Sequence, residues 1–182
     1  TLTDKEFVLL KTELSSRTQT PFGAAKWLKG ENGIARITMP REDVSLGAMS
    51  LVLYSNRDIG GEISSYEVVH QIAKQRSSAD GRDRRFDVTL LINGLPIAQI
   101  ELKQVTTKDG IYQAFNQVKK YAEEGVFRND IFSTLQLFVV SNEQTTRYFA
   151  NALPKNMHRK LLFSWRTKNN QKVENLYEFC KQ

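Results

Sequence analysis

Three residues in the middle of the chain have the types and spacing of a metal-dependent hydrolytic site. Asp87 lies near the start of one apolar run, and Glu101 and Lys103 lie near the end of the next. Two carboxylates can hold a divalent cation, and a lysine beside them can act on the water that attacks a phosphate. The pattern therefore predicts a nuclease site whose catalytic residues are Asp87, Glu101 and Lys103.

The spacing of the second acid and the lysine follows from strand geometry. Side chains alternate along a strand, so Glu101 and Lys103 point the same way, about 6 to 7 Å apart. Leu102 is expected to pack into the core and to offer its backbone carbonyl as a third metal ligand beside Asp87 and Glu101. Such oxygen ligands suit magnesium. Two nearby carboxylates favour a charged Lys103, which would orient water or stabilise developing charge rather than act as a base.

The connection between the two runs decides whether the acids meet. Asn93-Gly94 is a strong hairpin signal. A three- or five-residue connection would pair Asp87 with Glu101, whereas a four-residue connection would turn the acids to opposite faces. The site therefore requires an odd-numbered connection or a bulge.

The rest of the pattern predicts an α/β fold, in which helices flank a mixed sheet made of an antiparallel meander and a later buried strand. Helices are expected from a capping box at Thr3-x-x-Glu6, over 109–124 with Asp109 as the cap and Gly125 as the stop, over 142–153, and in a final amphipathic stretch over 173–180. Strands are expected over 49–54, 66–73, 86–92, 97–105 and 135–140, the last of them buried on both faces. Residues 15–41 are rich in glycine and proline, and their structure is left open.

Composition and charge bound the partners. The chain has 182 residues, of which 40% are hydrophobic, and this suits one domain with a substantial core. A net charge of +6 favours a polyanionic partner such as nucleic acid. The single cysteine, Cys180, excludes an internal disulfide and fits a reducing cytoplasm. No apolar run is long enough to span a bilayer, so no membrane partner is expected.

A longer segment resembles a known family. Residues 85–104, RFDVTLLINGLPIAQIELKQ, resemble the nuclease signature of the R (restriction) subunit of type I restriction enzymes. That signature has the form R-x-D-[IV]-x-L-[FL]-[IV]-N-G-L-P-[IL]-x-x-I-E-L-K. The flanking segments YEVVHQI, QAFNQVKKY, LQLFVVSN and LLFSWRT resemble the family's next core elements. The match covers about residues 66–182 well and the first 60 poorly.

The resemblance implies a fold, a site and a reaction. The fold would be the restriction-endonuclease-like sheet of the PD-(D/E)XK nuclease superfamily. Asp87 and Glu101 would bind Mg²⁺, which Mn²⁺ could replace, and Lys103 would be catalytic. Gln117 and Tyr121, one helical turn apart, would shape the phosphate side of the site. The reaction would be hydrolysis of phosphodiester bonds in double-stranded DNA.

The resemblance also implies partners. The modification and specificity subunits of a type I restriction complex would accompany the chain. ATP would be used only by a motor region outside this sequence, because no G-x-x-x-x-G-K-[ST] loop is present. The chain begins without methionine and is expected to be a fragment, a single nuclease domain over 1–182 whose residues 155–182 start the connection to that motor.

Basic residues provide candidate DNA contacts. Arg84 and Arg85 lead to Asp87 and are expected to hold the DNA backbone, together with Lys74, Arg76 and Arg82. Residues 155–172 carry six Lys or Arg and no acid, which predicts a second DNA or motor contact or an ordinary solvated surface.

Other interpretations of the same residues stay open. One is an autonomous nuclease of the same superfamily, such as a junction resolvase or a repair exonuclease. Another is a non-catalytic DNA-binding module in which the acids and the lysine only form ion pairs. Related nucleases also place an acid on the first helix, but Glu6 is expected to serve the capping box and Glu13 to be solvated.

Overall fold

The computed structural model describes residues 1–57, 60–74 and 83–181, which form two compact units. One unit comprises 1–67, 92–95 and 127–134, and the other comprises 68–91, 96–126 and 135–182. The single domain over 1–182 stays a prediction. Within the described residues, every helix is too short or too polar to traverse a bilayer.

The first unit packs two helices near a two-stranded sheet. The elements are α1 (Asp4–Arg17), α2 (Pro21–Lys29), β1 (Ile34–Pro40), the 3-10 turns η1 (Val44–Leu46) and η2 (Ile131–Thr134), and β2 (Ala48–Ser55). The segment that the sequence left open thus contains α2 and β1. Thr20 caps α2 by accepting from the Gly23 amide, and Pro21 occupies the first helical turn, where its missing N–H costs nothing. The strand expected over 49–54 is confirmed as part of β2.

The predicted capping box of α1 is confirmed, and Glu6 does more than cap. Its carboxylate accepts from the Thr3 amide at 3.0 Å, the Glu42 amide at 3.0 Å and Arg41 Nε at 2.7 Å. Only 3% of Glu6 is exposed, whereas Phe7 beside it is 50% exposed. The amides of Thr3 and Glu42, followed by the Arg41 guanidinium, lower the pKa of Glu6 to about 2.

A Glu6→Gln variant is expected to unfold more easily at pH 7. The ionised carboxylate stabilises the folded chain above its ordinary pKa of 4.5, and this contribution is lost as the pH falls towards about 2. Urea denaturation at pH 7 and pH 3 measures the difference, which should shrink at pH 3. Glu13→Gln on the same helix is the control, since Glu13 faces Arg17 at 3.9 Å near the surface and should change little at either pH. An equal loss at both pH values would contradict the electrostatic account.

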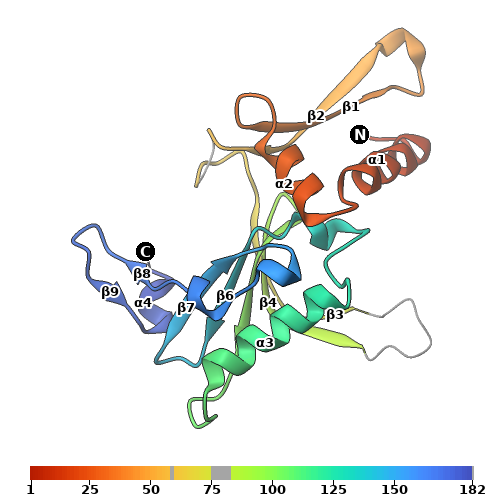
Figure 1. Ribbon diagram of the computed structural model, residues 1–182. Helices are drawn as coiled ribbons and strands as arrows, with labels where there is room; N and C mark the ends of the chain where they lie inside the picture. Colours follow the sequence, from red (N-terminus) through yellow and green to blue (C-terminus); the bar gives the residue numbers. More distant parts are fainter. Residues whose placement is uncertain (58–59, 75–82, 182) are drawn as a thin grey trace. The chain divides into compact units, whose positions relative to one another are not determined.

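The second unit is built on a five-stranded mixed sheet, so the predicted fold class is confirmed. Its strand order is β3-β4-β5-β6-β7, made of β3 (Tyr66–Lys74), β4 (Arg84–Ile92), β5 (Leu95–Leu102), β6 (Leu137–Ser141) and β7 (Thr146–Ala150). β5 and β6 run parallel and are connected through α3 (Gly110–Glu123), whereas β6 and β7 run antiparallel. Figure 1 shows α3 running alongside this sheet.

Both faces of the sheet are covered near β6 and β7. Phe149 of β7 contacts Phe115 of α3, with ring centroids 5.0 Å apart. The neighbouring Tyr148 contacts Trp165 at 5.6 Å on the opposite face, because successive side chains alternate. Trp165 belongs to β8 (Trp165–Arg166), which pairs with β9 (Lys172–Val173) and lies near α4 (Leu176–Phe179) (Figure 1). Two 3-10 turns, η3 (Pro154–Asn156) and η4 (Arg159–Leu161), precede β8 in the chain. Four of the five β6 residues are buried, so the predicted burial of this strand is confirmed.

Four local predictions need correction. The helix expected over 173–180 is restricted to α4 (Leu176–Phe179), because Val173 belongs to strand β9. The helix expected over 142–153 is wrong, because Thr146–Ala150 forms strand β7, whose β-branched and aromatic residues pack on β6 and α3. The strand expected to reach Val105 ends at Leu102. Asp109 lies at the N-cap of α3 in a left-handed conformation, but its side chain makes no capping hydrogen bond. Gly125, with φ of 74°, follows α3 as the predicted stop.

Candidate functional site

The hairpin between β4 and β5 carries the candidate site. Only Asn93 and Gly94 connect the strands, with φ of 50° and 76°, as in a type I′ turn. The connection is thus even-numbered, which leaves the other predicted route, a bulge, as the way in which the acids can meet. An unbroken ladder with this turn would place Asp87 opposite Ile100 and turn its side chain away from Glu101.

The two acids nevertheless come together. Asp87 Oδ2 accepts from the Leu102 amide at 2.8 Å, which places its carboxylate at the end of β5. Its charge also acts on Glu101 and raises the pKa of that carboxyl. Phe86 and Thr89 are both fully buried although they lie three positions apart in β4, so burial does not follow strict alternation there. This departure from alternation in β4 lies next to Asp87, where the two acids come together although the turn is even-numbered.

Glu101 is the most deeply buried member of the site. It is 1% exposed, and its Oε1 accepts from Lys103 Nζ at 3.1 Å. Its Oε2 is buried without a hydrogen-bond partner among the residues that the structure describes. Burial and then the charge of Asp87 raise the pKa of Glu101 to about 7, although Lys103 opposes the shift. An ionised Glu101 is therefore destabilised in the metal-free protein.

A hydrogen-bond chain extends from Glu101 through Lys103 to α3. Lys103 Nζ donates to Gln117 Oε1 at 2.7 Å, and Gln117 Nε2 donates to the Tyr121 hydroxyl at 2.7 Å. The two α3 residues share one helix face because they are four positions apart. The structure thus brings Asp87, Glu101, Lys103, Gln117 and Tyr121 together in one unit.

Leu102 does not pack into the core as predicted. It is 36% exposed, whereas Ala98 and Ile100 on the same face of β5 are each 7% exposed. Leu102 is the last residue of β5, and the apolar cover of this face does not reach it. Its amide is occupied by Asp87, and its carbonyl remains a candidate metal ligand.

The predicted DNA-facing arginines have different surroundings. Arg84 donates to Glu124 Oε2 from Nε at 2.9 Å and from Nη2 at 2.6 Å. The guanidinium of Arg84 lies 5.3 Å from the centroid of the Tyr121 ring. Arg85 is exposed and donates to Gln71 Oε1 at 3.3 Å. Lys74 donates to the Val126 carbonyl. Arg76 and Arg82 lie outside the described residues.

The sequence interpretation did not identify three further residues near the site. Gln71 Nε2 lies 3.5 Å from Asp87 Oδ1, and Glu124 holds Arg84. Gln99, two positions before Glu101 on the same face, is fully buried, and neither atom of its amide has a hydrogen-bond partner within the described residues. The sequence does contain a signal for Glu124. It follows Tyr121 by three positions, and this spacing predicts that both residues lie on the same face of the helix.

The donor atoms fit a small divalent cation. Asp87 and Glu101 supply carboxylate oxygens, and the Leu102 carbonyl would supply a third oxygen, a set typical of magnesium or manganese. The buried Oε2 of Glu101, which has no hydrogen-bond donor in the described part of the chain, is suited to a metal bond. Across the described residues, no cluster of three or more His, Cys, Asp or Glu side chains is arranged to hold a metal. A site at this hairpin would therefore rest on two carboxylates and main-chain or solvent oxygen.

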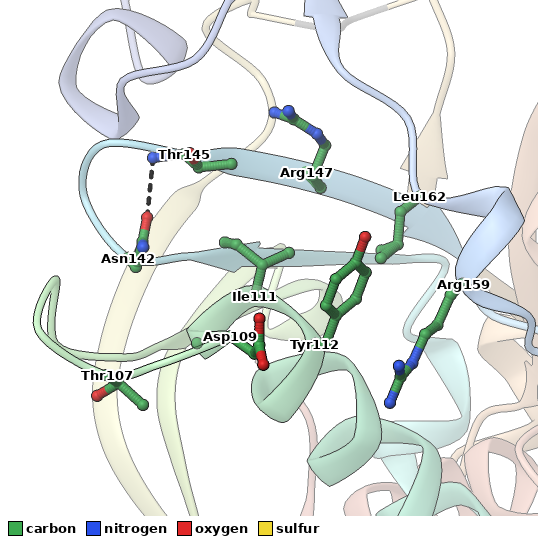
Figure 2. A pocket seen from close by; sticks show the side chains of 10 residues that line it. Thr107, Asp109, Ile111, Tyr112, Asn142, Thr145, Arg147, Arg159 and Leu162 are labelled. Carbon is green, nitrogen blue, oxygen red and sulfur yellow. Dashed lines mark hydrogen bonds between the residues drawn. The ribbon is translucent and has the colours of Figure 1, made fainter.

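A pocket of about 340 Å³ adjoins the strand end that carries Lys103. Figure 2 shows it between the start of α3, the β6–β7 turn and the segment of Arg159 and Leu162. A Cβ at Gly110, which lines the pocket, would lie 3.3 Å from Lys103 Cβ. Arg159 lies over the Tyr112 ring at 4.8 Å, and Arg147 binds Glu174 at 2.6 Å.

Comparison with known proteins gives a family match. The family model described as "Type I restriction enzyme R protein N terminus" matches residues 51–157. The chain is 40% identical over 111 residues to the "Type I restriction enzyme EcoprrI endonuclease subunit" of Escherichia coli, a match that covers 60% of this chain and 35% of that protein. It is 32% identical over 181 residues to the "Type I restriction enzyme SauMSSORF170P endonuclease subunit" of Staphylococcus aureus (strain MSSA476), a match that covers 99% of this chain and 17% of that protein. The chain thus spans 35% or less of each of these relatives.

Proposed function

Because the chain belongs to the family of N-terminal regions of type I restriction enzyme R proteins, we propose that it is the magnesium-dependent endonuclease domain of such a subunit. It would hydrolyse phosphodiester bonds of double-stranded DNA. The observation that carries this proposal is the meeting of Asp87 and Glu101 beside Lys103 at the end of one hairpin. The site would be of the PD-(D/E)XK type.

Asp87, Glu101 and the Leu102 carbonyl would hold the metal. Magnesium bound there, or manganese in its place, would polarise the scissile phosphate and favour deprotonation of the attacking water. A bound cation would stabilise the ionised forms of both neighbouring acids, because its positive charge offsets their mutual repulsion. The cation would also give the buried Oε2 of Glu101 a partner, which this oxygen lacks among the residues that the structure describes.

Lys103 would orient the attacking water and stabilise negative charge on the phosphate. Its ammonium group is already held by Glu101 and Gln117, and the Lys103 side chain is 21% exposed, so it would also meet a substrate oxygen. Gln117 and Tyr121 would shape the phosphate side of the site by fixing this lysine. Arg85 is exposed on the same strand as Asp87 and would contact the DNA backbone.

The wider assembly follows from the family rather than from the geometry of the site. The full subunit would work with modification and specificity subunits, and ATP would be used only by a motor region outside this sequence. Such a complex would act on DNA in the cytoplasm. The family assignment supports this function over an autonomous nuclease of the same superfamily.

Titration of Mn²⁺ by calorimetry tests the metal site. We expect the wild-type chain to bind Mn²⁺ and Asp87→Ala to bind it at least ~10-fold more weakly, because a charged ligand is lost. Asp83→Ala, which removes an exposed acid just before β4, should bind as the wild type does. If neither wild type nor Asp87→Ala binds, the titration is repeated with a short DNA duplex. Equal affinity of wild type and Asp87→Ala, or continued absence of binding with DNA, would contradict the proposal.

A further inference from the structure

We propose that Arg84 and Glu124 are positioning residues, which fix the orientation of Lys103 through Tyr121 and Gln117. This inference rests on the proposed function, because it assigns a role in the same reaction. It gives Arg84 a task different from the predicted contact with the DNA backbone. One continuous series of contacts within a single unit of the chain connects these residues.

The series begins at a nearly buried ion pair. Arg84 and Glu124 have side chains that are 15% and 16% exposed, and the guanidinium meets both carboxylate oxygens. A two-point Arg–carboxylate contact fixes the plane of the guanidinium as well as its position. Arg84 is therefore held by the protein at a defined place near the start of β4.

The fixed guanidinium lies against Tyr121. Its central carbon is 5.3 Å from the ring centroid, within the range of a cation–π contact. Phe86 contacts the same ring, with centroids 6.0 Å apart. The ring is thus confined between β4 side chains, so its hydroxyl has little freedom to move.

The Tyr121 hydroxyl in turn holds the Gln117 amide at the end away from Lys103. Because the hydroxyl accepts from Nε2 at 2.7 Å, Oε1 points to Lys103 Nζ, also at 2.7 Å. The reversed amide would present its NH₂ group to an ammonium group, and both groups are donors. A lysine stem is flexible, so this acceptor limits the positions that the ammonium group can take.

The helix spacing makes the series possible. Gln117, Tyr121 and Glu124 lie at positions i, i+4 and i+7 of one helix face. One end of this face meets Lys103 at the end of β5, and the other meets Arg84 at the start of β4. α3 therefore links two strand positions that must keep their relative placement for Lys103 to face the two acids.

Single-turnover cleavage by the intact restriction complex tests the proposal with Glu124→Gln and Arg84→Lys. Each change weakens the two-point pair without removing a group that would touch DNA, metal or Lys103 directly. We expect cleavage to slow by about 10- to 100-fold, since small displacements of catalytic groups have effects of this size. DNA affinity and Mn²⁺ affinity should stay within about 2-fold of wild type.

Glu174→Gln is the matched control. Glu174 forms an ion pair with Arg147 at 2.6 Å in the same unit. Through Thr146 and Ser141 this pair reaches the backbone amide of Lys103 rather than its ammonium group. If the cleavage rate falls only because an ion pair is weakened, it should fall in Glu174→Gln as well as in Glu124→Gln. We expect the rate to fall in Glu124→Gln alone.

A double mutant tests the order of the series. Tyr121→Phe removes the hydroxyl that fixes Gln117, so adding Glu124→Gln should slow cleavage no further than Tyr121→Phe alone. If the two losses multiply instead, Glu124 does not act through Tyr121 and the proposal is overturned.

The opposite assignment gives a different result. If Arg84 contacted the DNA backbone, releasing it from Glu124 would tighten DNA binding, and Arg84→Ala would weaken binding and lower its salt dependence. That pattern, or wild-type cleavage by Glu124→Gln, would overturn the positioning role. Asp87→Ala serves as reference. Wild-type cleavage by this variant would contradict the proposed function, whereas its inactivity beside an active Glu124→Gln would contradict this inference alone.

Discussion

Lys103→Met is expected to slow DNA cleavage by the restriction complex about 10²- to 10³-fold or more, while Mn²⁺ affinity stays close to wild type. The ammonium group is held 3.1 Å from Glu101 and 2.7 Å from Gln117, which places a positive charge beside one of the two acids. Methionine keeps much of the apolar stem and removes the charge. Chemistry should therefore be lost without loss of the fold, and single-turnover kinetics with calorimetry would measure both effects.

The control for this prediction is Lys120→Met. Lys120 is an exposed lysine of α3 that follows Gln117 by one helical turn. Its removal lowers the net charge by the same amount, so any general loss of attraction to DNA would appear in both variants. Cleavage by Lys103→Met at the rate of Lys120→Met would show that Lys103 is an ordinary ion-pair partner.

The strands of the candidate site could be predicted because their signals are local. Apolar runs on either side of Asn93-Gly94 define the hairpin, and alternation alone predicts that Glu101 and Lys103, which directly follows β5, point the same way. The spacing of Gln117 and Tyr121 likewise follows from helix geometry. These features depend on residues close in sequence.

The meeting of Asp87 with Glu101 could not be derived in the same way. The two-residue turn alone would separate the acids, and they meet where burial in β4 departs from alternation. Such departures depend on packing against the rest of the unit. The strand β7 was missed for a related reason, since Thr146 and Phe149 become buried only through β6 and α3.

The ion-pair partner of Arg84 could not be predicted from the sequence either. Arg84 and Glu124 lie far apart along the chain, and a basic stretch near a candidate nuclease site favours a DNA contact on charge alone. Only the tertiary fold shows that β4 begins beside the end of α3. Charge patterns in sequence thus identify candidate contacts but not the residues that already neutralise them.

Glu101→Gln should have opposite effects on function and stability. We expect metal binding to weaken at least ~10-fold and cleavage to fall at least ~100-fold, because a carboxylate ligand is lost. The metal-free protein, measured above pH 7, should instead become more stable by about 1 to 2 kcal/mol. Thermal unfolding with and without Mn²⁺ would measure both changes.

The sign of the stability change follows from the surroundings of Glu101. Burial and the neighbouring Asp87 disfavour its charge, and they outweigh the attraction of Lys103. Glutamine has nearly the same shape and carries no charge to desolvate. Lys103 is 21% exposed and keeps Gln117 as a partner, so it does not become a buried unpaired charge.

Glu123→Gln is the control for stability, because it removes one exposed carboxylate from α3 in the same unit. It should leave the unfolding temperature and metal binding nearly unchanged. A Glu101→Gln protein that is less stable than both wild type and Glu123→Gln would mean that the ion pair with Lys103 dominates. The site would then be a stabilising contact of the fold, and Asp87 and Glu101 would have no need of a metal to lie together.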